Sequence, residues 1–253
     1  MEKRLQEMVC DLEERIAQGD LRAKIAWATC FAFDHPQYAN TPEMIQKIVQ
    51  YYEEGVAEND FLSMNNLGAL YYSGTLLPQN YARAMALYTK AAELGEVQAQ
   101  CNLGYCYYYG RVGAPDYKKA FEWFLLSSLN GNANATYKLG DMYLDEKYWP
   151  KNEKMAFTLY CKAMERLGYD DHLRADIAYR IAKCKHDGIG TEKNLMEAYQ
   201  AIQCSEKEYY CKCLEQDDPF AEGLLRRTQK FRETLTAQIE ELLTKKQKGF
   251  SEK

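Results

Sequence analysis

Apolar residues recur along this chain at the three- and four-residue spacing of one helix face, in short segments separated by turn residues. In one segment the apolar positions are Leu67, Leu70 and Tyr71, and the next segment presents Ala84 and Tyr88. No segment shows the strict alternation of apolar and polar positions that is typical of a half-buried strand. The pattern therefore predicts an all-α protein built from pairs of short helices.

The predicted helix pairs are copies of one another with a constant period. Leu67, Leu103 and Leu139 are each followed by glycine, and consecutive members of this set lie 36 residues apart. A weaker copy begins at Ile181, and another lies upstream at Ile25 with a longer loop after it. Units of this kind cannot bury their apolar faces alone and stack on their neighbours. The sequence thus predicts five stacked helix pairs, with divergent outer copies because terminal repeats face solvent on one side.

Glycine recurs at two positions of the repeat. The glycine after each repeat leucine, such as Gly68 or Gly104, lies inside a predicted helix, where it costs roughly 1 kcal/mol relative to alanine. Its return at a single phase predicts that a neighbouring helix approaches closely there. Gly74 and Gly110 suit helix ends that need a left-handed residue, and prolines follow in the predicted loops.

These strings resemble the Sel1-like repeat family. The resemblance is carried by Leu-Gly-x-x-Tyr-x-x-Gly at residues 67–74, by residues 116–124 and by the trailing Gly131, and it extends over about residues 20–206. It implies a right-handed α/α superhelical solenoid that scaffolds protein complexes, often in bacterial signalling or host contact, and it implies no reaction. The chain departs from the family pattern at Glu146, which replaces a loop glycine.

The repeat phase divides the chain into a cap, five repeats and a C-terminal segment. The predicted ranges are 1–19 for an N-terminal capping helix, 20–60 for divergent repeat 1, 61–95 for repeat 2, 96–131 for repeat 3, 132–168 for repeat 4, 169–207 for divergent repeat 5, and 208–253 for a C-terminal amphipathic helix with a basic tail. Asp218 followed by Pro219 is typical of a helix start, and apolar positions continue from Leu224 to Leu242 at near-heptad spacing. That helix either covers the last repeat or pairs with a partner or a second copy of the chain.

By analogy with tetratricopeptide repeats, the first helix of each pair lines an inner surface, where the stripe opposite the repeat leucine faces a groove. The predicted partner-binding residues on this stripe are Asn65, Tyr72, Cys101, Tyr105, Tyr108, Tyr109, Tyr137, Asp141 and Asp145. On the fifth repeat the same stripe holds Tyr179, Lys183, His186 and Asp187. Tyrosine is favoured at interfaces because it gives rigid contact area and a hydroxyl group. With acidic residues at one side, the groove suits a peptide that carries Lys or Arg; alternatively, the tyrosines only pack between adjacent repeats.

Composition narrows the function classes. The 253 residues are 47% hydrophobic and 27% charged, with a formal net charge of −5, which is not a disordered composition. This balance does not favour nucleic acid, whose binding needs basic groups, and the basic tail from Lys245 to Lys248 is interpreted as solvated. No stretch has the roughly 18 apolar residues that span a bilayer, and the charged N-terminus lacks the apolar core of a signal peptide. We therefore expect no membrane association. Because the nine cysteines are irregularly spaced, we also expect a cytoplasmic protein with reduced thiols.

Little in the sequence points to chemistry. None of its three histidines lies in a metal-binding helix motif, and it has no glycine-rich phosphate loop. The best zinc candidate is the set Cys184, His186, Cys204, Cys211 and Cys213, but the last two lack the usual ligand spacing and face apart on a helix. We therefore expect no catalytic residue, metal or cofactor, and predict a scaffold or adaptor that binds a protein or peptide. The alternatives are a scaffold that dimerises through the C-terminal helix, and an enzyme or zinc protein with an unrecognised site.

Overall fold

The computed structural model describes residues 3–168, 173–216 and 219–251, and within these ranges every regular element is a helix. The all-α prediction is therefore confirmed. The chain divides into two compact units, Met1–Leu126 and Ser127–Lys253. Among the described helices, none combines the length and the apolar character needed to span a bilayer.

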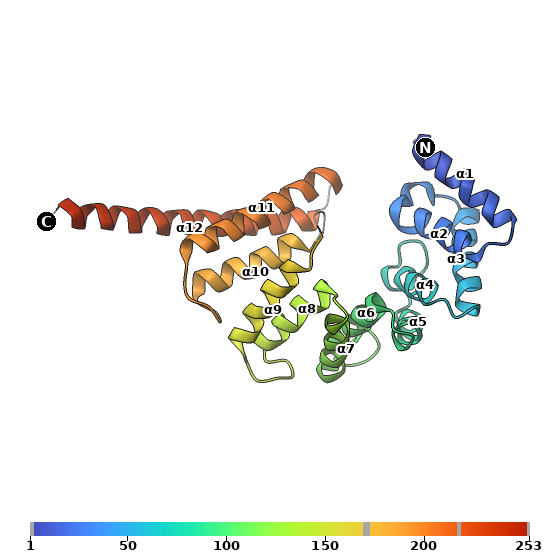
Figure 1. Cartoon of the computed structure of the whole chain (residues 1–253), viewed down its shortest axis with the longest axis horizontal. Coiled ribbons are helices and arrows are strands. Elements are labelled where there is room, and N and C mark those ends of the chain that lie inside the picture. Colours follow the sequence, from blue (N-terminus) through green and yellow to red (C-terminus); the bar gives the residue numbers. More distant parts are fainter. Residues whose placement is uncertain (1–2, 169–172, 217–218, 252–253) are drawn as a thin grey trace. The chain divides into compact units, whose positions relative to one another are not determined.

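The first unit is a series of helices in which each of α1 to α6 packs on its neighbours in the chain (Figure 1). Its elements are α1 (Lys3–Ala17), α2 (Leu21–Thr29), the π-helical turn η1 (Cys30–Asp34), the 3-10 turn η2 (Pro36–Tyr38), α3 (Pro42–Ala57), α4 (Phe61–Ser73), α5 (Tyr81–Glu93) and α6 (Val97–Tyr108). α7 (Tyr117–Leu129) begins in this unit and ends in the next. Buried side chains of α1 to α6 form one continuous core, as stacked repeats require.

The second unit continues the same arrangement. Its elements are α8 (Ala133–Leu144), α9 (Glu153–Glu165), α10 (Arg174–Asp187), α11 (Leu195–Gln216) and α12 (Pro219–Ser251), and consecutive helices pack on one another. The predicted border between residues 207 and 208 falls inside α11, because residues 202–216 contain no glycine or proline that would end this helix. The predicted cap residue Asp218 and the side chains of Lys246 and Lys248 lie outside the described residues.

The helix ends follow the cap chemistry of the sequence. The Asp60 carboxylate accepts a hydrogen bond from the backbone N–H of Ser63 at 2.6 Å and so caps the start of α4. The same helix ends at Gly74, whose φ of 73° is left-handed, as predicted. At the equivalent place in repeat 4, Glu146 has a φ of 51°. The loss of the family's glycine there costs roughly 1–2 kcal/mol of backbone strain.

The glycine after each repeat leucine lies under an aromatic ring of the second helix of its pair. A Cβ atom on Gly68 would lie 2.9 Å from the Tyr88 ring, and one on Gly104 would lie 2.7 Å from the Phe124 ring. The corresponding glycine of repeat 4 fits its ring in the same way. The predicted close approach is thus confirmed, and the neighbour is a ring seated on the glycine.

Polar side chains of successive first helices connect neighbouring repeats. In the first unit, Asn66 Nδ2 donates to Thr29 Oγ1 at 3.2 Å, and Asn102 Nδ2 donates to Asn65 Oδ1 at 3.1 Å. The partners in each pair are 37 residues apart, which is close to one repeat. Because these groups are withdrawn from water, their hydrogen bonds offset the loss of hydration and favour one stacking register.

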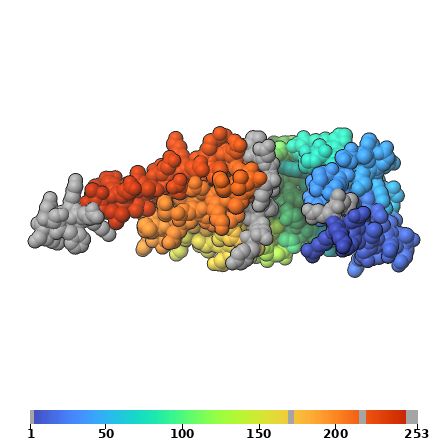
Figure 2. Space-filling model, turned by 90° about the horizontal axis from the view of Figure 1, so that it is seen from above, coloured from blue at the N-terminus to red at the C-terminus, as the bar shows by residue number. Residues whose placement is uncertain are grey.

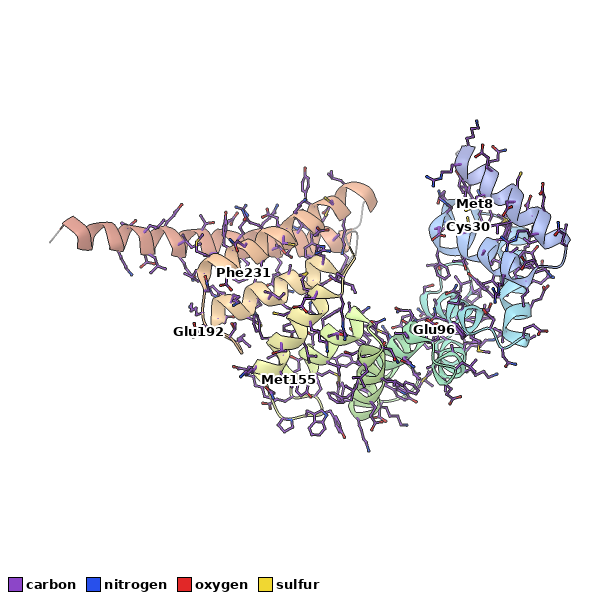
Figure 3. All side chains as sticks on the ribbon, viewed as in Figure 1. Met8, Cys30, Glu96, Met155, Glu192 and Phe231 are labelled. Atoms are coloured by element: carbon purple, nitrogen blue, oxygen red, sulfur yellow. The ribbon has the colours of Figure 1, made fainter. Side chains whose placement is uncertain are left out.

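The first half of α12 covers the fifth repeat and lies along α11 (Figure 2). Leu235 is fully buried in a cluster with Ala182 of α10 and Ile202 of α11. Phe231, labelled in Figure 3, packs its ring against aromatic side chains of α10. Farther along, Leu242 is 49% exposed. The helix therefore covers the last repeat with its first half, while later apolar side chains face solvent.

Candidate functional site

A cluster of tyrosines surrounds a single arginine in the first unit. Arg111 Nε donates a hydrogen bond to the Tyr72 hydroxyl at 3.0 Å. The guanidinium carbon lies 5.4, 5.0 and 5.0 Å from the ring centres of Tyr72, Tyr81 and Tyr109, which is within reach of cation–π attraction. We call Arg111 and its surrounding tyrosines the tyrosine surface. Its tyrosines are Tyr72, Tyr81, Tyr105, Tyr108 and Tyr109.

The rings of the tyrosine surface also pack on one another. Tyr105 stacks on Tyr109 with ring centres 6.0 Å apart, and Tyr108 meets Tyr109 edge-on at 5.1 Å. Tyr105 also contacts the Phe124 ring at 5.1 Å. Tyr105 and Tyr108 are half-buried, whereas Tyr109 is 49% exposed. The cluster thus combines internal packing with a solvent-facing edge, and partner binding at that edge stays a prediction.

Burial affects the protonation of the Tyr72 hydroxyl beside Arg111. Desolvation raises the pKa of Tyr72 above its ordinary value by more than the hydrogen bond from Arg111 lowers it. The same hydrogen bond raises the pKa of Arg111. At neutral pH the Tyr72 hydroxyl therefore stays protonated beside the positive charge of Arg111.

Three of the nine predicted partner-binding residues lie in the core. Cys101 has no exposed area, and Asn65 and Tyr137 are each 8% exposed. All three stand two residues before a repeat leucine. At Asn65, the hydrogen bond from Asn102 shows that the following repeat covers this stripe. These positions are therefore corrected from surface residues to core residues.

The second unit contains a pocket lined by side chains of α8, α9, α10, α11 and α12. Its volume is about 380 Å³, which falls within the roughly 300–1,000 Å³ of typical ligand sites. Side chains of both charges line it, with tyrosines and aliphatic groups between them. The charged lining residues are Asp141, Asp145, Asp176, Arg180, Lys183 and Arg227. We call this cavity the unit-2 pocket.

A largely buried ion pair is part of the pocket lining. Arg180 Nε and Nη2 donate to the two Asp141 oxygens at 2.6 and 2.8 Å. Asp141 also accepts hydrogen bonds from the Tyr160 hydroxyl at 2.9 Å and from the Lys138 ammonium at 3.3 Å. Arg180 and Asp141 are 39 residues apart. Arg180 thus joins repeat 5 to repeat 4 from the same repeat position at which Asn102 joins repeat 3 to repeat 2.

The ion pair holds both of its groups in their charged forms. Burial alone would raise the pKa of Asp141, but the hydrogen bonds and charge of Arg180 outweigh burial and hold that pKa below its ordinary value. Burial alone would lower the pKa of Arg180, and Asp141 raises it instead.

Nearby, the Tyr209 hydroxyl donates to Asp176 at 2.9 Å, and burial together with this carboxylate raises the pKa of Tyr209. The tyrosine therefore stays protonated near neutral pH.

The pocket brings together residues that the sequence analysis named and residues that it missed. Asp141 and Asp145 were predicted as partner-binding, and Lys183 lies on the same predicted stripe of the fifth repeat. Arg180 was missed, although it stands where repeats 2 and 3 have asparagine. Arg227 had no comparable sequence indication, because the pattern does not reveal which side of α12 lies against α10.

The candidate zinc ligands do not come together in the described part of the chain. There, no three His, Cys, Asp or Glu side chains gather as metal ligands would. Burial raises the pKa of the Cys184 thiol to about 12, whereas zinc binds thiolate. His186 instead places Nε2 3.0 Å from Oε1 of Gln238 on α12. None of the nine cysteines, all of which lie in the described part of the chain, forms a disulfide bond.

The repeats match a known family model. The model described as Sel1 repeat matches residues 62–96, 97–132, 133–168 and 175–200, which together make up more than half of the chain. These ranges follow predicted repeats 2 to 4 closely and cover much of predicted repeat 5. A comparison with curated protein sequences found no match.

Several solved structures share this architecture. A protective antigen of uropathogenic Escherichia coli that displays an SLR fold is 23% identical with a TM-score of 0.67, covering 90% of this chain and 47% of that one. A Sel1 repeat protein from Oxalobacter formigenes is 15% identical with a TM-score of 0.65, covering 85% of this chain and 88% of that one. A protein from Klebsiella pneumoniae is 17% identical with a TM-score of 0.53, covering 90% and 99%. The chain thus spans about half the length of the E. coli antigen, and at these identities the likeness shows the fold alone.

Proposed function

Because the chain belongs to the Sel1 repeat family, whose solenoids are commonly protein-interaction scaffolds, we propose that it binds a peptide or protein on the surface of its first helices. The tyrosine surface is the observation that supports this most directly. It gathers several partly exposed aromatic rings around Arg111 in one unit.

The composition of the tyrosine surface suits a binding hot spot. Tyrosine and arginine are enriched among the residues that dominate interface energies. Stacking of Tyr105 on Tyr109 and the hydrogen bond from Arg111 to Tyr72 hold these side chains before a partner arrives. Because the side chains are already ordered, binding avoids much of the roughly 0.5–1.5 kcal/mol that immobilising each one costs.

A double substitution, Tyr109→Ser with Arg111→Gln, tests this proposal. Tyr109 is 49% exposed, so the change removes partner contact more than core packing. We expect capture of partner proteins from native cell extract, quantified by mass spectrometry, to fall at least about tenfold. Tyr210→Ser, at an α11 tyrosine that is 54% exposed, is the matched control and should retain capture. A folded double variant with the full set of wild-type partners would contradict the proposal.

A second candidate partner is another copy of this chain. Leu242 and Leu243 on α12 are 49% and 56% exposed, and burying these adjacent leucines against the same helix of a second copy would remove apolar surface from water. Light scattering of the full chain measures its mass directly. A dimer that becomes a monomer on Leu242→Glu and Leu243→Glu substitution would support this candidate, and a wild-type monomer would dismiss it.

We propose no catalytic role, cofactor or nucleic-acid partner. Proteins of this family are typically non-catalytic scaffolds, and the acidic net charge of −5 disfavours a nucleic-acid surface. We also propose a reducing, cytoplasmic location, because none of the nine cysteines forms a disulfide bond.

A further inference from the structure

The unit-2 pocket carries charges that discriminate between ligands. Three acids and three bases line it, so the net charge of the lining does not decide which ligand it favours. The deciding property is which of these groups already have partners within the protein. A charge that is paired and hydrogen-bonded inside the fold attracts a ligand less than one that keeps free donors or acceptors.

Two of the three acids are already paired. Both Asp141 oxygens accept two hydrogen bonds each, one of them from Arg180. Asp176 accepts a hydrogen bond from the Tyr209 hydroxyl at 2.9 Å and lies in the first turn of α10. The positive end of the helix dipole stabilises a carboxylate at that position. Neither acid therefore requires a cation from a ligand.

Two of the three bases keep unused donors. Arg227 Nε donates to the Tyr179 hydroxyl at 2.8 Å, and its guanidinium lies 4.1 Å from the centre of that ring. These contacts orient the guanidinium. Among the described residues, the terminal nitrogens of Arg227 and the ammonium of Lys183 have no hydrogen-bonding or ion-pair partner. An oriented guanidinium with free N–H groups suits a carboxylate, which it can bind through two hydrogen bonds.

We propose that the unit-2 pocket binds the carboxylate of an Asp or Glu side chain of a partner polypeptide, held by Arg227 and Lys183. This inference rests on the proposed function, because it assigns a chemistry to the polypeptide that the scaffold binds. It reverses, for this pocket, the sequence-based expectation of a ligand that carries Lys or Arg. That expectation treated Asp141 as a free acid, whereas Arg180 neutralises it.

Asp145 distinguishes an acidic ligand from a basic ligand. It is exposed at the C-terminal end of α8, where the helix dipole disfavours a negative charge. A basic ligand would use Asp145, the one lining acid with no ion-pair partner among the described residues. An acidic ligand would be repelled by it. Removing this charge therefore has opposite effects on the two kinds of ligand.

Random-peptide phage display on the immobilised full chain supplies the probe. Enriched peptides are synthesised, and their affinities for the wild type and each variant are measured by fluorescence anisotropy. We expect Lys183→Gln and Arg227→Gln each to weaken binding about tenfold, the effect of losing one charged hydrogen bond. Asp145→Asn should leave binding unchanged or strengthen it.

Two controls separate ligand binding from folding. Lys162→Gln removes an exposed α9 lysine outside the pocket lining and should leave affinity unchanged. Lys183 is itself exposed, so Lys183→Gln remains informative if Arg227→Gln loosens α12. A double-mutant cycle supplies the specific readout: replacing the peptide's Glu by Gln should weaken binding to the wild type by more than it weakens binding to the Arg227→Gln variant, which keeps Lys183.

The contrary outcomes are distinct. Peptides that bind the wild type and both basic variants equally, or that lose affinity with Asp145→Asn, would overturn the inference and leave the proposed function standing. The inference would likewise be overturned if peptides bound without needing an acidic residue while the pocket took up a small dicarboxylate such as glutarate. If the chain captures partner proteins but phage display enriches no peptide, the inference is overturned and the proposed function is not. A chain that captures nothing fails the proposed function as well.

Discussion

At the scale of single residues, the repeat depends on the fit between a small residue in the first helix and a bulky one in the second. Gly104 lies under Phe124, twenty residues later in the sequence. In repeat 5 the same two positions are held by Ala182 and Ile202, both fully buried in one cluster. Ala182 thus has a methyl group that Gly104 lacks, and the side chain opposite it, Ile202, is narrower than the Phe124 ring. The two positions change together in a way that conserves volume, which close-packed cores require.

Gly104→Ala should destabilise the protein although alanine is the better helix former. The new methyl group would lie 2.7 Å from the buried Phe124 ring, and overpacking of this kind costs about 1–3 kcal/mol. The helix-propensity gain of about 1 kcal/mol offsets only part of that cost. We expect the free energy of unfolding in urea to fall by up to about 2 kcal/mol.

Gly223→Ala is the matched control for this change. Gly223 lies inside α12, and a Cβ atom there would have nothing within 4 Å. Only the propensity gain applies, so this variant should be more stable than the wild type by up to about 1 kcal/mol. Equal gains for Gly104→Ala and Gly223→Ala would refute the explanation by ring contact.

At the scale of helices, the central repeats were predictable because each one encodes its own core and its own ends. The 36-residue period locates the repeat leucines, and Gly74 sits at the end of α4, as its place in the repeat predicts. The close approach at Gly68 also followed from the sequence, since a glycine inside a helix needs a steric reason. These features are local, so no knowledge of distant segments was required.

The parts that were not predictable depend on segments far apart in the sequence. Arg227 reaches Tyr179 across 48 residues, and no periodicity in α12 specifies that contact. The stripe that includes Cys101 was assigned to a surface by analogy, whereas Cys101 has no exposed area. The length of α11 is a different case. The absence of glycine or proline in residues 202–216 was visible in the sequence and indicated a longer helix.

At the scale of the whole molecule, packing within each unit runs from one helix to the next in chain order. In the second unit α8 packs on α9, α9 on α10, α10 on α11 and α11 on α12. Stability in such an array is approximately a sum of repeat terms and nearest-neighbour interfaces. Damage to one repeat should therefore remain close to its origin in the chain.

Leu235→Ala tests this locality, and Leu242→Ala on the same helix is its matched control. Leu235 is fully buried against Ala182 and Ile202, whereas Leu242 is 49% exposed. Truncating the buried leucine should cost about 2–5 kcal/mol of local stability and the exposed one less than about 0.5 kcal/mol. In hydrogen–deuterium exchange we expect Leu235→Ala to speed exchange in α10, α11 and α12 and to leave α2 to α5 unchanged, because only repeats adjoining the cavity lose packing. Equal acceleration along the entire described chain would mean that it unfolds as one cooperative unit, contrary to a nearest-neighbour array.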